Sequence, residues 1–129
     1  MINTIPSGDR STVERYLAAM QTGPGGVDDL VDLFDNDAVY VEPFSGQAQT
    51  HAGKAAIRAF FEVALDNHLK GVRLTLDRLD IDGGQVRSEW TCELPLFSAP
   101  MRGFDLLSLR DGRIVRLETT VTEFPPMRA

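Results

Sequence analysis

Three acidic groups spread along the chain could act together on a small molecule. Tyr16 lies in an apolar helical stripe, Glu42 directly precedes Pro43, and Asp105 lies in an apolar stretch near the C-terminal end. A carboxylate fixed between a proline and the ring of Phe44 could be a partly buried general base. An aspartic acid among apolar neighbours stays protonated and donates a hydrogen bond, because burial penalises its charged form. The set therefore predicts proton-transfer chemistry in an apolar pocket.

Each of the three residues also has a simpler structural interpretation. A tyrosine on an apolar stripe usually packs in the core while its hydroxyl finds a partner, and most glutamates lie on the surface. Asp105 shares one strand face with Met101 and Leu107, but Phe104 and Leu106 make the opposite face apolar as well. Alternation therefore leaves open whether Asp105 points into the protein or to solvent.

The other reactive side chains do not predict a metal or cofactor site. Cys92 is the only cysteine, which excludes an internal disulfide and a cysteine-based metal cluster. The two histidines are His51, expected on an exposed loop, and His68. The sequence has no glycine-rich phosphate loop, zinc-protease motif or serine elbow. We expect no metal and no organic cofactor.

The N-terminal half predicts three helices and one strand. Val13, Tyr16, Leu17 and Met20 recur at helical spacing after a capping box at 11–14. A second helix is predicted over 27–34, and a third over 53–65. The strand is expected over 38–42, with a loop over 45–50.

The C-terminal half predicts four strands in antiparallel succession. The segment 72–81 alternates and slips phase near Asp77, as at a β-bulge, and Asp82-Gly83-Gly84 predicts a hairpin turn. Further strands are predicted over 86–94, 101–110 and 113–124, the last two joined at Asp111-Gly112. Helices grouped before such strands predict an α+β fold with helices on one face of a mostly antiparallel sheet.

Length and charge narrow the class of protein. The 129 residues suit one domain, expected to span 1–129. A formal net charge of -6 argues against binding to nucleic acid or to anionic membranes, both of which need a basic patch. The segment 1–8 has neither a basic start nor a long apolar run. We therefore expect a cytoplasmic protein without a membrane segment.

Five segments resemble the Δ5-3-ketosteroid isomerases of the nuclear transport factor 2-like superfamily, which also contains the SnoaL-like polyketide cyclases. The resemblance extends over roughly 13–121 and is carried by Glu14–Met20, Val27–Phe34, Asp37–Pro43, Gly53–Phe61 and Phe104–Val115. It implies three N-terminal helices packed on a curved sheet that forms a cone-shaped pocket, the cystatin-like arrangement. Because this fold hosts many functions, the polar positions are the more specific part of the resemblance.

The resemblance also implies a role for each acidic group. In these isomerases a tyrosine of the first helix and a protonated aspartic acid on a late strand form an oxyanion hole, and an aspartate before a proline is the base. Tyr16, Asp105 and Glu42 match these positions, so the implied activity is isomerisation of a hydrophobic ketone, a steroid or a polyketide-like molecule, without a cofactor. Glu42 departs from the aspartate of the family, and the loop 44–52 is longer, which leaves the substrate open.

Two further expectations concern the pocket wall and partners. Strand and helix parity predicts a wall built from Val41, Phe60, Phe61, Trp90, Leu107 and Val121. The resemblance implies a homodimer through the strands 86–94 and 113–122, with a hydrophobic small molecule as ligand. The alternatives are a SnoaL-like cyclase and a non-catalytic binding module. An epoxide-hydrolase-like site is disfavoured, because Arg102 and Asp105 fall on opposite strand faces.

Overall fold

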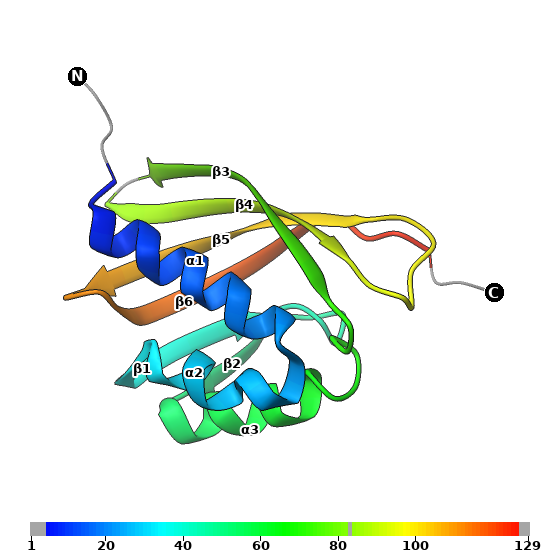
Figure 1. The fold of residues 1–129 in the computed structure, drawn as a ribbon, viewed down its shortest axis with the longest axis horizontal. Helices are drawn as coiled ribbons and strands as arrows, with labels where there is room; N and C mark the ends of the chain where they lie inside the picture. The colour runs from blue at the N-terminus through cyan, green and yellow to red at the C-terminus, as the bar shows by residue number, and fades with distance from the viewer. Residues whose placement is uncertain (1–4, 83, 127–129) are drawn as a thin grey trace.

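The computed structural model describes residues 5–82 and 84–126, and the predicted α+β architecture is confirmed (Figure 1). The described residues form three α-helices, α1 (Ser7–Gln21), α2 (Val27–Asp32) and α3 (Lys54–Ala64), with a 3-10 turn, η1 (Gly23–Gly26), between the first two. The apolar stripe of α1 is buried from Val13 to Met20, as its helical spacing predicts. Among the described residues, no helix is long and apolar enough to cross a membrane.

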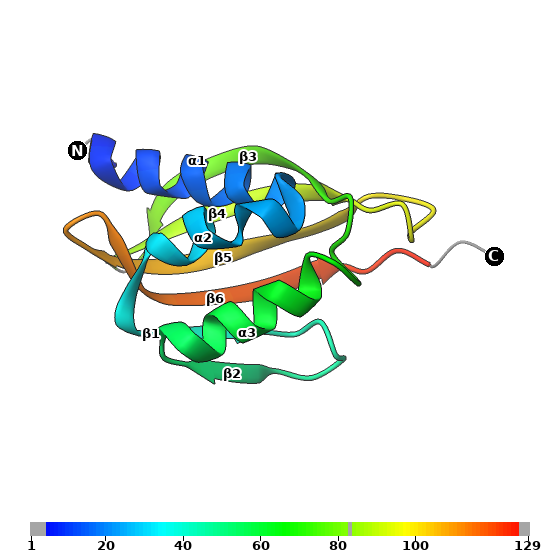
Figure 2. The ribbon, with the colours of Figure 1, turned by 60° about the horizontal axis from the view of Figure 1, so that its bottom comes forward.

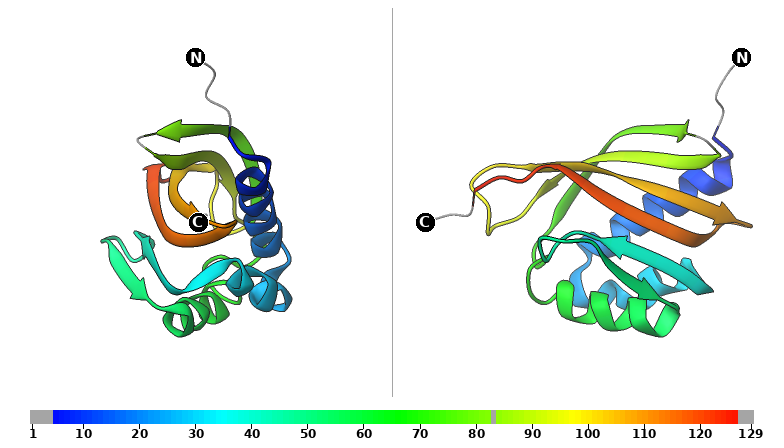
Figure 3. Two further views of the ribbon diagram at one scale, coloured as in Figure 1. Left: turned by 90° about the vertical axis from the view of Figure 1, so that its left-hand side faces the viewer. Right: turned by 180° about the vertical axis from the view of Figure 1, so that it is seen from behind.

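The strands form one six-stranded sheet in the order β2-β1-β6-β5-β4-β3. Their bounds are β1 (Phe34–Glu42), β2 (Gln49–Ala52), β3 (Arg73–Asp82), β4 (Gln85–Glu93), β5 (Met101–Arg110) and β6 (Arg113–Glu123). All neighbouring pairs are antiparallel except β1 and β6, which run parallel. The sheet is strongly curved, and α1 lies along its concave side (Figure 3).

The structure differs from the prediction at the start of the first helix, at the end of the second helix and at the end of the loop 45–50. Helix α1 begins at Ser7 after Pro6, and no side chain caps it, so the predicted capping box is absent. Thr12 of that motif instead lies 2.7 Å from the carbonyl oxygen of Gly112, which ties α1 to the β5–β6 turn. The predicted second helix ends before Phe34, which starts β1. Strand β2 begins at Gln49, inside the predicted loop 45–50, and its polar residues gave no strand pattern.

The predicted strand details are otherwise confirmed. The register of β3 on β4 shifts between Leu76 and Arg78, which is the predicted bulge at Asp77. Strand β4 alternates buried and partly buried residues from Val86 onward. The β5–β6 turn uses Asp111 and Gly112, both at positive φ, as a tight hairpin requires. The predicted turn after β3 includes Gly83, which lies outside the described residues.

Aromatic rings join the helices to the sheet next to the cavity described below. The Tyr16 ring makes edge contacts with Phe34 and Phe61, at centroid distances of 6.2 Å and 6.4 Å. Tyr40 of β1 stacks on Phe61 of α3 at 5.2 Å. Helix α3 packs on β1 and β2 at one end of the sheet (Figure 2). This aromatic packing fixes the two tyrosines relative to each other.

Candidate functional site

A small, mostly apolar cavity lies between α1 and the concave face of the sheet. The space open to the centre of a water molecule is about 20 Å³, which is room for roughly one water. Four residues bring oxygen-bearing side chains to its wall: Tyr16, Tyr40, Asp105 and Thr119. The other lining residues are Leu17, Met20, Phe44, Leu69, Val72, Leu74, Trp90, Cys92 and Met101.

The register of three strands directs Asp105 into this cavity. Asp105 pairs with Ser88 of β4 and with Thr119 of β6, and all three side chains are buried. Only 4% of Asp105 is exposed, so of the two interpretations left open by the sequence, the structure shows the inward one. The inward face is set by α1, which covers one side of the sheet.

Burial favours the neutral form of Asp105. Burial raises its pKa to about 7, although hydrogen bonds with Thr119 and Trp90 oppose that rise. The Thr119 hydroxyl donates to Oδ1 of Asp105 at 2.7 Å. Because Oδ1 accepts this bond, the acidic proton can reside on Oδ2. Asp105 can therefore donate a hydrogen bond to a ligand below about pH 7.

The two tyrosines continue a polar chain from Asp105 to α1. Burial raises the pKa of Tyr16, and the nearby Tyr40 and Asp105 raise it further. Burial raises the pKa of Tyr40 as well, while its hydrogen bonds with Thr119 and Tyr16 oppose the rise. The connected side chains thus run from Tyr16 through Tyr40 and Thr119 to Asp105. Both phenols stay neutral and can donate hydrogen bonds.

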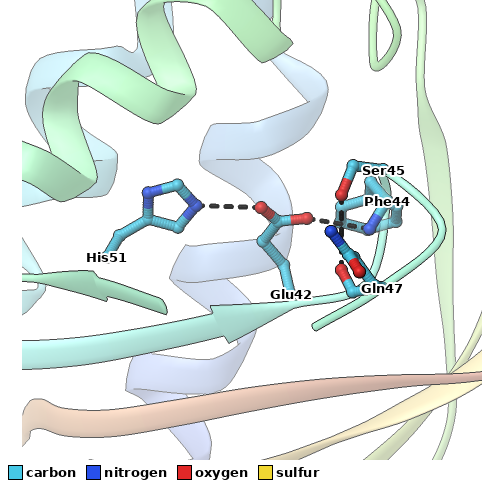
Figure 4. A network of polar contacts seen from close by, with 5 residues as sticks. All are labelled: Glu42, Phe44, Ser45, Gln47 and His51. Carbon is cyan, nitrogen blue, oxygen red and sulfur yellow. Dashed lines mark hydrogen bonds and ion pairs between the residues drawn. The ribbon is translucent and has the colours of Figure 1, made fainter. Parts of the chain in front are cut away.

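Glu42 lies beside this cavity without lining it. Its side chain is only 3% exposed. Oε1 accepts a hydrogen bond from the backbone N–H of Phe44 at 2.8 Å, and Oε2 lies 2.8 Å from Nε2 of His51. Figure 4 shows the carboxylate between His51 on one side and the turn that contains Phe44 on the other. Tyr40 and Phe44, two residues before and after Glu42, both line the cavity.

His51 is the site residue that the sequence did not reveal. It lies on β2 opposite Tyr40 of β1, and its ring is 20% exposed. The ring also packs on Phe60, at a centroid distance of 4.7 Å. When Glu42 is ionised, Nε2 must carry the proton of this hydrogen bond. The expected exposed loop is therefore a strand that brings a histidine to a buried carboxylate.

One of the six predicted wall residues lines the cavity. Trp90 does so, because Gly103 opposite it has no side chain and leaves room for the indole. The remaining five lie outside the lining: Val41, Phe60, Phe61, Leu107 and Val121. Phe61 of α3 and Leu107 of β5 belong to the buried core, and Phe60 and Val121 pack against that core. Val41 alternates with Tyr40 and Glu42 and falls on the other face of β1.

Two further observations limit the chemistry. Within residues 5–82 and 84–126 no group of three or more histidine, cysteine, aspartate or glutamate side chains is arranged to hold a metal ion. Burial raises the pKa of the Cys92 thiol to about 12, so this lining residue is a poor nucleophile. Arg102 is exposed whereas Asp105 is buried, which confirms that they face opposite sides of β5. The groups available at the cavity are therefore phenols, a neutral acid and the nearby Glu42–His51 pair.

Solved structures with this fold carry different functional names. The chain is similar to a putative ketosteroid isomerase from Kribbella flavida, with a TM-score of 0.70 and 20% identity over 92% of this chain and 82% of that one. It is similar to a putative polyketide cyclase from Sinorhizobium meliloti, with a TM-score of 0.70 and 22% identity over 90% and 95%. It is also similar to an epoxide hydrolase-like protein from M. tuberculosis, with a TM-score of 0.66 and 18% identity over 88% and 81%.

These likenesses show the fold alone, because all three identities are low. No curated protein matches the chain. The model of the SnoaL-like domain matches residues 13–117, which is most of the sequence. This match runs from α1 through the middle of β6 and includes Tyr16, Glu42 and Asp105. The protein therefore belongs to the SnoaL-like domain family.

Proposed function

We propose that this protein is a cofactor-independent enzyme that moves a proton α to the carbonyl group of a hydrophobic small molecule, as ketosteroid isomerases do. The observation that carries the proposal is the neutral, buried Asp105 facing the same apolar cavity as Tyr16. Two donors that already face a small, mostly apolar cavity stabilise a developing oxyanion with little reorganisation. The ligand class follows from the uncharged, mostly apolar lining.

Glu42 is the proposed base. It takes the proton from the α-carbon, and the electrons of the broken C–H bond form the enolate, whose oxygen accepts hydrogen bonds from Tyr16 and Asp105. Glu42 then returns the proton to another carbon of the conjugated system. A carboxylate has about four acceptor positions, and the Phe44 N–H and His51 use two of them. His51 is a positioning residue in this scheme, because it touches the base and not the substrate.

Double-bond migration in a 3-oxo-Δ5-steroid, followed by the absorbance of the enone product, tests this proposal. Tyr16→Phe should lower kcat by about 10²- to 10³-fold, the usual cost of removing one oxyanion donor. Glu42→Gln should abolish turnover, whereas Glu62→Gln, which changes an exposed carboxylate on α3, should leave it unchanged. If the wild-type protein does not turn over the steroid, steroid isomerisation is excluded. Full activity of Glu42→Gln would exclude Glu42 as the base.

A non-catalytic binding role is the second candidate, and one observation favours it. Both carboxylate oxygens of Glu42 are already hydrogen-bonded, and Glu42 does not line the cavity. Tyr16 and Asp105 would then only hold the carbonyl group of a ligand. Tight binding of equilenin, a phenolic steroid that mimics the enolate, together with no turnover of any ketone would support this role.

A polyketide cyclase is the third candidate, since the chain belongs to the SnoaL-like family. In that reaction the same two donors would activate a carbonyl for an aldol ring closure, with Asp105 as acid and base. Ring closure of a linear polyketide ester, followed by mass spectrometry of the product, separates this activity from isomerisation. Loss of closure in Asp105→Asn would support the role of Asp105.

A further inference from the structure

The Asp105 cavity is far smaller than a ligand of the proposed class. Its roughly 20 Å³ holds about one water, whereas small-molecule sites usually measure about 300–1,000 Å³. The cavity can therefore receive the carbonyl end of a ligand, but the body of the ligand must lie elsewhere.

A second, larger groove adjoins the cavity. By the same measure its volume is about 340 Å³, and it is lined by Phe44, His68, Leu69, Leu94, Leu96, Phe97, Met101, Phe124 and Pro125. Three of these residues, Phe44, Leu69 and Met101, also line the cavity, so they form the partition between the two spaces. Among the described residues that line this groove, His68 is the only one with a titratable side chain.

The groove carries large apolar side chains that are exposed to solvent. Among the described residues three large apolar side chains are strongly exposed, and two of them, Leu96 at 44% and Phe124 at 54%, line the groove. The third, Val63, lies on α3 away from it. Exposed apolar side chains gathered in a concavity of ligand size are typical of a binding groove.

We propose that this groove is the second half of the ligand site and holds the apolar body of an elongated, uncharged carbonyl compound. The inference rests on the proposed function, because the carbonyl end of the same ligand enters the Asp105 cavity. Entry displaces the ring of Phe44 from the partition. The backbone N–H of Phe44 is hydrogen-bonded to Glu42, so the residue whose ring forms the partition also holds the base.

His68 adds a polar requirement to the ligand. Its Nε2 is buried and has no hydrogen-bond partner among the described residues, and its ring packs against Phe44 and Phe60. Burial lowers the pKa of His68, so the ring is neutral and can donate or accept one hydrogen bond. Displacement of Phe44 uncovers this ring. The ligand class is therefore an elongated hydrophobic molecule with a carbonyl at one end and a hydroxyl or second carbonyl along its body.

Two phenols of different length test the groove without requiring turnover. Equilenin, with four rings, is long enough to reach the groove, whereas 2-naphthol, with two rings, serves as the short probe; binding of each is followed by its fluorescence. Leu96→Asp places a charge in the groove, and Val63→Asp is the matched control on the other exposed apolar residue. Loss of the apolar contact and burial of a charge should weaken equilenin binding by about tenfold or more. The effect on 2-naphthol should be smaller, because its second ring enters the groove only next to the partition. Val63→Asp should change neither.

The outcomes separate this inference from the proposed function. If both phenols bind and Leu96→Asp weakens the binding of neither, the groove is not part of the site, and the proposed function stands. If neither phenol binds the wild-type protein, both the carbonyl site and its extension are wrong. Stopped-flow measurement of Phe44→Ala adds a second criterion: the association rate of equilenin should rise, and an unchanged rate would show that Phe44 is not the partition.

Discussion

Replacement of Asp105 by asparagine removes one ionisable group from the cavity and preserves the shape of the side chain. The amide oxygen of asparagine can still accept the hydrogen bond from Thr119, which is 2.7 Å long in the wild-type protein. The amide nitrogen replaces the protonated Oδ2. The variant therefore isolates the energetic cost of burying an acid that ionises near neutral pH.

The size of this cost follows from the pKa of Asp105. It is about 7 in the folded protein, against an ordinary value of 3.8. Between these values the folded state holds a proton that the unfolded state has lost, so the free energy of unfolding falls as the pH rises. At about 1.4 kcal/mol per pKa unit, the shift of roughly three units corresponds to about 4 kcal/mol. The loss begins near pH 4, is complete slightly above pH 7, and is absent in Asp105→Asn.

Denaturant unfolding of both proteins between pH 4 and pH 8 measures this difference. Other carboxyl groups titrate in both proteins and cancel, so the stability of Asp105→Asn relative to wild type should rise by about 4 kcal/mol across this range. Asp66→Asn, at an exposed aspartate, should track the wild-type curve. A difference between Asp105→Asn and wild type that does not change with pH would show that Asp105 ionises normally, and it would remove the neutral donor from the proposed site.

Four further outcomes are expected. Turnover of the ketone should fall above about pH 7, because ionised Asp105 cannot donate to the enolate, and a rate that stays constant to pH 9 would contradict this. His51→Ala should lower kcat by about tenfold with little change in KM, since a charge-assisted bond to the base is lost, and His51→Gln should recover most of it. Gly103→Ala should lower the free energy of unfolding, measured with denaturant, by about 1–3 kcal/mol, because the new methyl group would collide with the carbonyl of Thr120 and the Trp90 ring. As a control, Gly8→Ala in α1 places its methyl group where no atom lies within 4 Å and should be stabilising. We also propose a homodimer through the outer face of β4–β6, where Arg87 lies 3.6 Å over the Phe104 ring; sedimentation should give the mass of a dimer, and Phe104→Glu should shift it toward the monomer.

The sequence predicts the elements well where one periodicity dominates. Strand β5 begins and ends where predicted, and the bulge at Asp77 is visible as a phase slip. The inward direction of Asp105 was not predictable from β5, because both faces of that strand carry apolar residues. It depends on which face α1 covers, and that is a property of the tertiary structure.

The contact between His51 and Glu42 could not be predicted from the sequence, for a different reason. Strand β2 has four residues and a polar surface, so it gives no alternating pattern. His51 reaches Glu42 only because the β1–β2 hairpin pairs it with Tyr40. The only usable signal was that the segment after Glu42-Pro43 could fold back on the strand before it. The prediction of the wall residues was mostly wrong for a similar reason. The position of the cavity depends on which turn of α1 crosses the sheet, and the sequence does not show this.

The parallel pairing of β1 with β6 has a consequence for how the chain folds. Tyr40 pairs in register with Leu117, and Thr119 of the same strand bonds Asp105. Contacts between residues so far apart in sequence must pay a large loop-closure entropy, which slows folding. The Tyr40–Thr119–Asp105 chain can form only after β6 has been synthesised. Until then Phe34, which is fully buried in the finished protein and pairs with Ile114 of β6, lacks part of its cover. Slow pairing of β1 with β6 therefore prolongs the time during which this apolar surface is open to contact with other chains.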